Sequence, residues 1–239
     1  MRKSMLILLT SFSFVATSCN ENTNKVHAIF VDTTLSTSTL KNDNPIRIMK
    51  HIESMLLNKV KSGETVIIYP IHSQTASASP IGEWMIPSNK GDMGDEKRKK
   101  QAIKNIISEA REVLFIESPI SETVRSSTSI FPIFNKVKRL SSKGIVEITI
   151  FSDMLEDNSS MSFTSLFGKM NKKEIKSLAI AQYNQLSDEI SIFGTNIRIF
   201  YPSTVVGDPN LERIMNKVDI YWETFFSEAG AKIFIFDLS

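Results

Sequence analysis

The feature that most constrains the fold is the alternation of short apolar runs with longer amphipathic segments. Runs with the composition of strands occupy residues 26–31, 65–71, 145–151, 196–201 and 232–236, and 83–86 fits a short edge strand closing a hairpin. Segments with helical apolar spacing occupy residues 44–60, 96–115, 129–140, 172–186 and 210–226. This order predicts an α/β fold: a doubly wound, Rossmann-like, mostly parallel sheet with helices on both faces.

Length and composition fit one globular domain. The chain has 239 residues, of which 41% are hydrophobic and 23% charged, close to ordinary globular usage. The formal net charge is +2, and Arg2 and Lys3 supply two of the positive charges, so the rest of the chain is near neutral. Charge therefore gives no reason to expect a nucleic-acid partner.

Residues 1–19 have the pattern of a secretory signal peptide. A short basic head is followed by an apolar stretch, residues 5–15, that is too short to span a bilayer as a helix. Small residues then precede Cys19, the only cysteine in the chain, so no intramolecular disulfide and no cysteine zinc site is possible. We expect this segment to be absent from the mature domain.

The small residues before Cys19 resemble the lipobox of bacterial lipoproteins, with Ala16 where leucine is usual. The resemblance implies lipidation of Cys19 and an exported protein anchored in the bacterial cell envelope. Residues 20–25 are polar and lack a hydrophobic pattern, which predicts a flexible tether before a domain at 26–239. Cleavage by ordinary signal peptidase is the alternative, because Ala16 and Ser18 also satisfy its rule.

Two of the predicted strands end in an aspartate. Asp32 follows the first strand and begins a hydroxyl-rich loop, and Asp153 follows the strand at 145–151. A third loop, at 118–127, is also rich in serine and threonine and leads to Thr128. Ligands of such sheets bind beyond the carboxyl ends of the strands, and these oxygen donors suit Mg²⁺ or Mn²⁺, with Ca²⁺ also possible.

These residues resemble the metal-ion-dependent adhesion site of von Willebrand factor A-type domains. In that family the site consists of Asp-x-Ser-x-Ser after the first strand, a threonine before a later helix and an aspartate after the fourth strand. The resemblance assigns metal ligation to Asp32, Thr34, Ser36, Thr128 and Asp153. It implies a protein-binding module in which the metal engages an acidic group of a partner.

The sequence departs from this pattern in three respects. The first loop lacks the glycine that is common there. Thr34 stands where serine is usual, and Met154 stands where glycine usually follows the second aspartate. Ser127 and Thr123 are alternatives to Thr128 as the hydroxyl ligand. Taken singly, an aspartate such as Asp32 also fits a turn or loop cap.

Two other functions remain open. One is a metal-free scaffold of the same fold that binds partners through loops such as residues 73–95. The other is a phosphotransfer-type hydrolase. Asp32 at the end of a strand resembles the nucleophile of haloacid-dehalogenase-like phosphatases, but Thr34 stands where that class needs a second aspartate. No phosphate-binding loop or nucleophile elbow accompanies it, so we expect a binding protein and not an enzyme.

Overall fold

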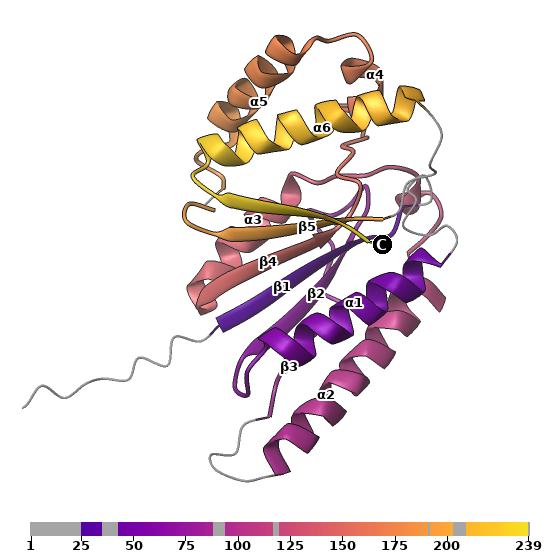
Figure 1. The fold of residues 1–239 in the computed structure, drawn as a ribbon, viewed down its shortest axis with the longest axis vertical. Coiled ribbons are helices and arrows are strands. Elements are labelled where there is room, and N and C mark those ends of the chain that lie inside the picture. The colour runs from indigo at the N-terminus through magenta and orange to yellow at the C-terminus, as the bar shows by residue number, and fades with distance from the viewer. Residues whose placement is uncertain are drawn as a thin grey trace, which may run out of the picture.

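The computed structural model describes residues 25–34, 43–87, 94–116, 120–190, 192–202 and 209–238. They contain one six-stranded sheet in the order β3-β2-β1-β4-β5-β6 (Figure 1). Its strands are β1 (Lys25–Asp32), β2 (Thr65–Ile71), β3 (Gly82–Met85), β4 (Ile145–Phe151), β5 (Asn196–Tyr201) and β6 (Lys232–Asp237). Only the β2–β3 pair is antiparallel, so the predicted doubly wound α/β fold is confirmed.

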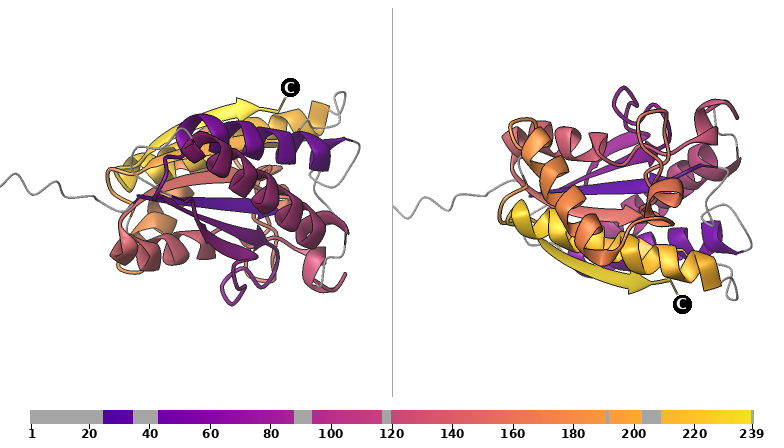
Figure 2. Two further views of the ribbon diagram at one scale, coloured as in Figure 1. Left: turned by 90° about the horizontal axis from the view of Figure 1, so that it is seen from below. Right: turned by 90° about the horizontal axis from the view of Figure 1, so that it is seen from above.

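Helices cover both faces of the sheet. They are α1 (Asn44–Lys59), α2 (Gly94–Arg111), α3 (Pro132–Leu140), α4 (Phe163–Phe167), α5 (Lys172–Leu186) and α6 (Pro209–Glu228). In the first core, α1 and α2 pack on the face of the sheet that carries Ile29 and Val31. In the second core, the helices α3, α4, α5 and α6 pack on the face that carries Ala28 and Phe30. Seen from below, α1 and α2 lie in front of the sheet; seen from above, α5 and α6 do (Figure 2).

Aromatic side chains fill much of the second core. Trp222 on α6 is fully buried and packs against Phe134, Phe163 and Phe226. Its indole Nε1 donates a hydrogen bond to the carbonyl oxygen of Met154 at 2.9 Å. Trp222 therefore links α6 to the loop that follows β4.

Two predicted boundaries are wrong, and one helix was not predicted. Residue 25 was placed in the tether, yet β1 already begins at Lys25. The helix predicted at 129–140 begins at Pro132, because Thr128 pairs with Asp157 through the backbone and holds the chain extended. The helix α4 was not predicted; its Phe163 and Phe167 lie one turn apart and stack on each other.

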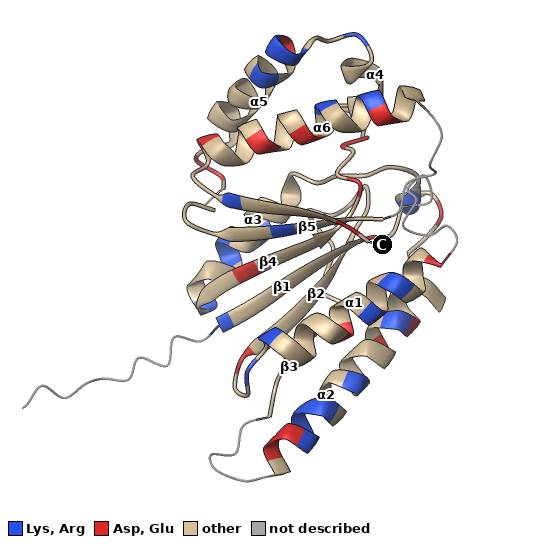
Figure 3. Cartoon of the chain, viewed as in Figure 1, with Lys and Arg blue, Asp and Glu red and all other residues tan. Residues whose placement is uncertain are grey.

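The basic run at the start of α2 is largely satisfied within the domain. Arg98 forms an ion pair with Asp95, and the Nζ of Lys99 donates to the carbonyl oxygen of Leu57. In Figure 3, basic and acidic residues both occur along the same helix. These contacts are typical of a solvated helix face and do not single out a polyanion site.

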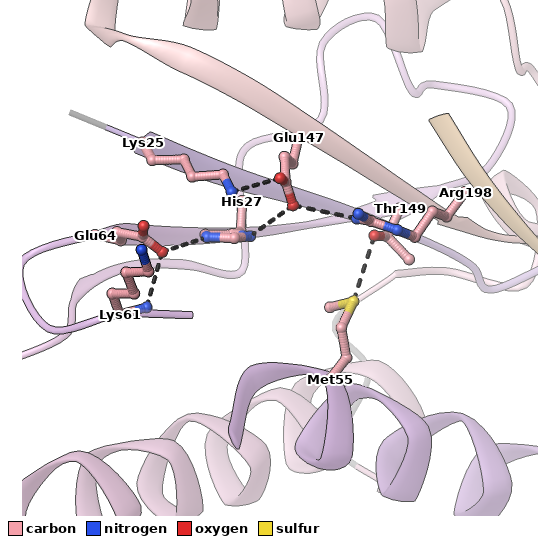
Figure 4. A network of polar contacts seen from close by, with 8 residues as sticks. All are labelled: Lys25, His27, Met55, Lys61, Glu64, Glu147, Thr149 and Arg198. Carbon is pink, nitrogen blue, oxygen red and sulfur yellow. Dashed lines mark hydrogen bonds and ion pairs between the residues drawn. The ribbon is translucent and has the colours of Figure 1, made fainter. Parts of the chain in front are cut away.

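A charged network lies at the amino ends of the strands (Figure 4). His27 of β1 is 2.7 Å from Glu64 through its Nε2, and Glu147 of β4 contacts both Lys25 and Arg198 of β5. Opposite charges on neighbouring strands stabilise their pairing, so the network ties the beginning of β1 to the rest of the sheet.

The predicted signal peptide, Cys19 and residues 20–24 lie outside the described residues. In the part of the chain that the structure describes, no helix combines the length and the apolar character needed to cross a bilayer. Export and lipidation therefore stay predictions.

Substitution of Trp222 by alanine is expected to lower the free energy of unfolding by about 3–5 kcal/mol, because it leaves a large cavity in the aromatic core. Met85→Ala is a suitable control, since Met85 is 72% exposed, and should change stability by less than about 0.5 kcal/mol. Urea unfolding measures both. Equal effects of the two substitutions would contradict this account of the core.

Candidate functional site

The two predicted aspartates lie at the same edge of the sheet. β1 and β4 are adjacent and parallel, with Val31 opposite Phe151, so Asp32 ends β1 just beside the point where Asp153 follows β4. Asp32 is fully buried and Asp153 is 6% exposed. The sheet order therefore brings together two carboxyl groups that are 121 positions apart in numbering, residues 32 and 153.

Hydroxyl groups surround the Asp32 carboxylate. Its Oδ1 accepts hydrogen bonds from the backbone N–H of Thr34 at 2.9 Å and from the Thr34 hydroxyl at 2.7 Å. Its Oδ2 accepts a bond from the Ser152 hydroxyl at 2.8 Å. Both oxygens are thus oriented by neighbouring groups, one from its own loop and one from the loop after β4.

Of the three hydroxyls considered in the loop before α3, Thr128 is the one with a described contact to the site. Its Oγ1 lies 3.1 Å from the Oγ1 of Thr34, and the residue is 1% exposed. Two backbone hydrogen bonds with Asp157 fix it there. Thr123 is exposed and Ser127 half-buried, with no described bond to the site. Ser36, the remaining predicted ligand, lies outside the described residues.

The chain after β4 adopts an unusual conformation. Met154 has φ of 59°, in the left-handed region that glycine adopts more readily, where the resembled family has its glycine. The Ser152 hydroxyl accepts from the Met154 N–H at 3.0 Å, and Asp153 Oδ1 accepts from the Leu155 N–H at 3.1 Å. These bonds and the burial of the Met154 side chain hold the turn that directs Asp153.

Burial raises the pKa of both carboxyl groups. The pKa of Asp32 rises to about 6, because desolvation outweighs the hydrogen bonds from Thr34 and Ser152. The pKa of Asp153 rises to about 7, because of desolvation and then the negative charge of Asp32. Two ionised carboxylates at this edge therefore repel each other in a poorly solvated place.

The donor set fits a hard divalent cation. Among the described residues, neither Asp32 nor Asp153 forms an ion pair with a lysine, arginine or histidine. The described ranges also hold no cluster of three or more histidine, cysteine, aspartate or glutamate side chains suited to a metal. A cation here would be held by two carboxylates plus hydroxyls, the chemistry that Mg²⁺ and Mn²⁺ accept.

Sequence reasoning missed three residues that shape the site, and two of them, Ser152 and Glu156, follow β4. Ser152 was not counted as part of it, although it directly precedes Asp153 and its hydroxyl binds Asp32. Glu156 is 1% exposed, and its Oε2 accepts a hydrogen bond from the N–H of Ile130 at 2.6 Å. Burial raises the pKa of Glu156 to about 7. Glu156 joins the loop after β4 to the segment just beyond Thr128, and no local motif announces that role.

The loop at 121–127 is fastened to the segments that follow β1 and β2. The N–H and the hydroxyl of Ser73 both donate to the carbonyl oxygen of Val124, at 3.2 Å and 2.8 Å. The Nε of Arg125 donates to the carbonyl oxygen of Thr33 at 2.7 Å. Arg125, a third residue that the sequence did not reveal, thus lies against the main chain between Asp32 and Thr34.

Searches of protein-family models and of curated protein sequences found no match. Similar solved structures include the VWA domain of SpRpn10 (9% identity, 90% of this chain, 89% of that chain, TM-score 0.35). A second is proximal thread matrix protein 1 from the mussel byssus, with 9% identity over 87% of this chain and 48% of that chain and a TM-score of 0.39. A third is the N-terminal domain of TFIIH p34, with 12% identity over 86% of this chain and 98% of that chain and a TM-score of 0.30. At these identities and TM-scores, they carry no argument about function.

The raised pKa values predict how stability depends on pH without metal. A carboxyl group whose pKa rises on folding binds more protons when folded, so its contribution to stability falls as pH rises from about 4 toward 7. Asp153→Asn removes the buried charge. We expect the stability gain of the variant over the wild type to be about 2–3 kcal/mol larger at pH 8 than at pH 5, because folded wild-type Asp153 is protonated at pH 5 and ionised at pH 8.

Urea unfolding in the presence of a chelator, at pH 5 and pH 8, measures this difference. Asp188→Asn is the matched control, because Asp188 is exposed and should show no gain at either pH. If Asp153→Asn showed the same stability difference from the wild type at both pH values, the ionised Asp153 would not be costly.

Proposed function

We propose that this chain is an exported, lipid-anchored protein-binding module of the von Willebrand A type. A divalent cation, Mg²⁺ or Mn²⁺, would be held by Asp32, Thr34, Ser36, Thr128 and Asp153. The observation that supports it is the meeting of two buried carboxyl groups with the hydroxyls of Thr34 and Thr128 at the carboxyl edge of the sheet. Ser152 joins this set through its bond to Asp32.

The charge of this donor set supports an acidic partner. Two carboxylates would balance a divalent cation, and the neutral hydroxyls would add no further negative charge. The cation can still accept a further oxygen ligand, because a hard divalent cation takes six or more, so the carboxylate of a partner could complete its coordination shell. The function proposed is therefore recognition of an acidic side chain on another protein and not catalysis.

The direction of β1 fits a tethered module. Lys25 begins β1 and follows the predicted tether, whereas Asp32 ends the same strand. Seven strand steps separate these residues by about 23 Å. An anchor on Cys19 would therefore hold the amino edge of the sheet toward the membrane and leave the Asp32 edge free to meet a partner.

A metal-free scaffold is the second candidate, and one observation favours it. Hydroxyl and N–H donors from Thr34 and Ser152 already satisfy both oxygens of Asp32. In that form the edge would be closed by hydrogen bonds, and binding would fall to the surrounding loops. No observation supports the phosphotransfer-type hydrolase, whose second aspartate position is occupied by Thr34.

Calorimetric titration of the protein lacking residues 1–19 with Mg²⁺ and Mn²⁺ tests the metal site. We expect binding that raises the melting temperature, and a loss of affinity of about 100-fold or more in Asp32→Ala and Asp153→Ala. Asp188→Ala, at an exposed position, should bind as the wild type does. Failure of the folded wild type to bind either metal would favour the metal-free scaffold.

Replacement of Cys19 tests the anchor separately. In a bacterial host, the wild type should partition into the detergent phase of an extract, because acyl chains contribute about 0.8 kcal/mol per buried CH₂. Cys19→Ala should move it to the aqueous phase. Recovery of both proteins in the aqueous phase would show ordinary cleavage and remove lipidation from the proposal.

A further inference from the structure

We propose that Arg125 is a specificity-determining residue of the site, whose guanidinium group pairs with the carboxylate of an acidic ligand beside the metal. The inference rests on the proposed function and assigns part of ligand recognition to a side chain outside the predicted metal ligands. Arg125 lies on a short 3₁₀ turn, Val124–Ser126, that leads to Thr128. It therefore belongs to the same loop as one predicted ligand.

Several bonds fix Arg125 at the edge of the site. Its Nε donates to the carbonyl oxygen of Thr33, the residue between Asp32 and Thr34. The preceding residue, Val124, is held by two hydrogen bonds from Ser73. Because the side chain is anchored through Nε and the backbone through Val124, the guanidinium group is pre-positioned and loses little freedom when a ligand binds.

The guanidinium group is not consumed by the protein's own carboxylates. Among the described residues, no aspartate or glutamate lies within ion-pair distance of Arg125, and of its guanidinium nitrogens only Nε has a described hydrogen bond. Burial lowers the pKa of Arg125, and the negative charge of Glu122 on the same loop acts in the opposite direction. The two terminal nitrogens of the half-buried guanidinium thus keep donors for an incoming anion.

The chemistry of the group suits a carboxylate. A guanidinium presents its N–H donors in a rigid plane, and its charge-assisted bonds to a carboxylate oxygen are stronger than neutral ones. A ligand carboxylate beside the metal would have one oxygen to direct at Arg125. A ligand without a planar, two-oxygen anion would lose that contact, so Arg125 would favour acidic side chains over other anions.

Acetate binding to the Mn²⁺-loaded protein tests this role. Water-proton relaxation is the readout, because acetate that binds Mn²⁺ displaces a water ligand. Arg125→Gln should weaken acetate binding about five- to tenfold, while the Mn²⁺ affinity without acetate changes less than about twofold. Arg125→Lys, which keeps the charge but loses the paired donors, should fall between. Arg139→Gln, at an exposed arginine of α3, should behave as the wild type does.

The possible outcomes separate this inference from the proposed function. Unchanged acetate affinity in a folded Arg125→Gln protein would overturn the role of Arg125 and leave the metal site in place. Parallel losses of Mn²⁺ and acetate affinity would also overturn it, because they would show a merely structural role. If the wild type bound no Mn²⁺, the proposed function would fail. Acetate binding to the metal-free protein would then test the role of Arg125 alone. Binding that Arg125→Gln weakens would support the inference, and binding that Arg125→Gln leaves unchanged, or no binding, would overturn it.

Discussion

The structure depends on the parallel pairing of β1 with β4 at the centre of the sheet. That pairing, with Val31 opposite Phe151, is what places Asp32 beside Asp153. Two carboxyl groups in a buried setting are unfavourable when both are ionised, and their raised pKa values express that cost. The hydrophobic layers on both faces of the sheet supply the stability that lets such an arrangement persist, as functional sites commonly require.

The turn at Met154 shows how strain and packing are combined at this edge. A left-handed conformation is unfavourable for methionine, yet the Met154 side chain is fully buried and its carbonyl oxygen accepts the indole N–H of Trp222. Glycine would relieve the strain but would leave the pocket of that side chain empty. The aromatic core under α6 therefore supports the same loop that carries Asp153, so that stability and site geometry share one set of contacts.

The sequence predicts the fold class because the apolar runs at β1, β2 and β4 are buried on both alternating sides, which only a covered parallel sheet allows. It also locates Asp32 and Asp153, since a strand end is a local feature. Ser152, Glu156 and Arg125 could not be assigned their roles in this way. Their hydrogen bonds join segments far apart in the chain, and a single sequence records no such distance. The short helix α4 was missed because its two phenylalanines lie among serines.

The two edges of the sheet are built for different tasks. At the amino edge, carboxylates such as Glu147 meet lysine and arginine side chains, so charge is neutralised within the sheet (Figure 4). At the carboxyl edge, Asp32 and Asp153 have hydroxyl and N–H partners but no described cation, and Arg125 has no described carboxylate. Charged groups are paired at the amino edge but lack ion-pair partners at the carboxyl edge. An external cation and an external anion would therefore stabilise the carboxyl edge more. That asymmetry, more than any single motif, is the physical reason to look for the partner there.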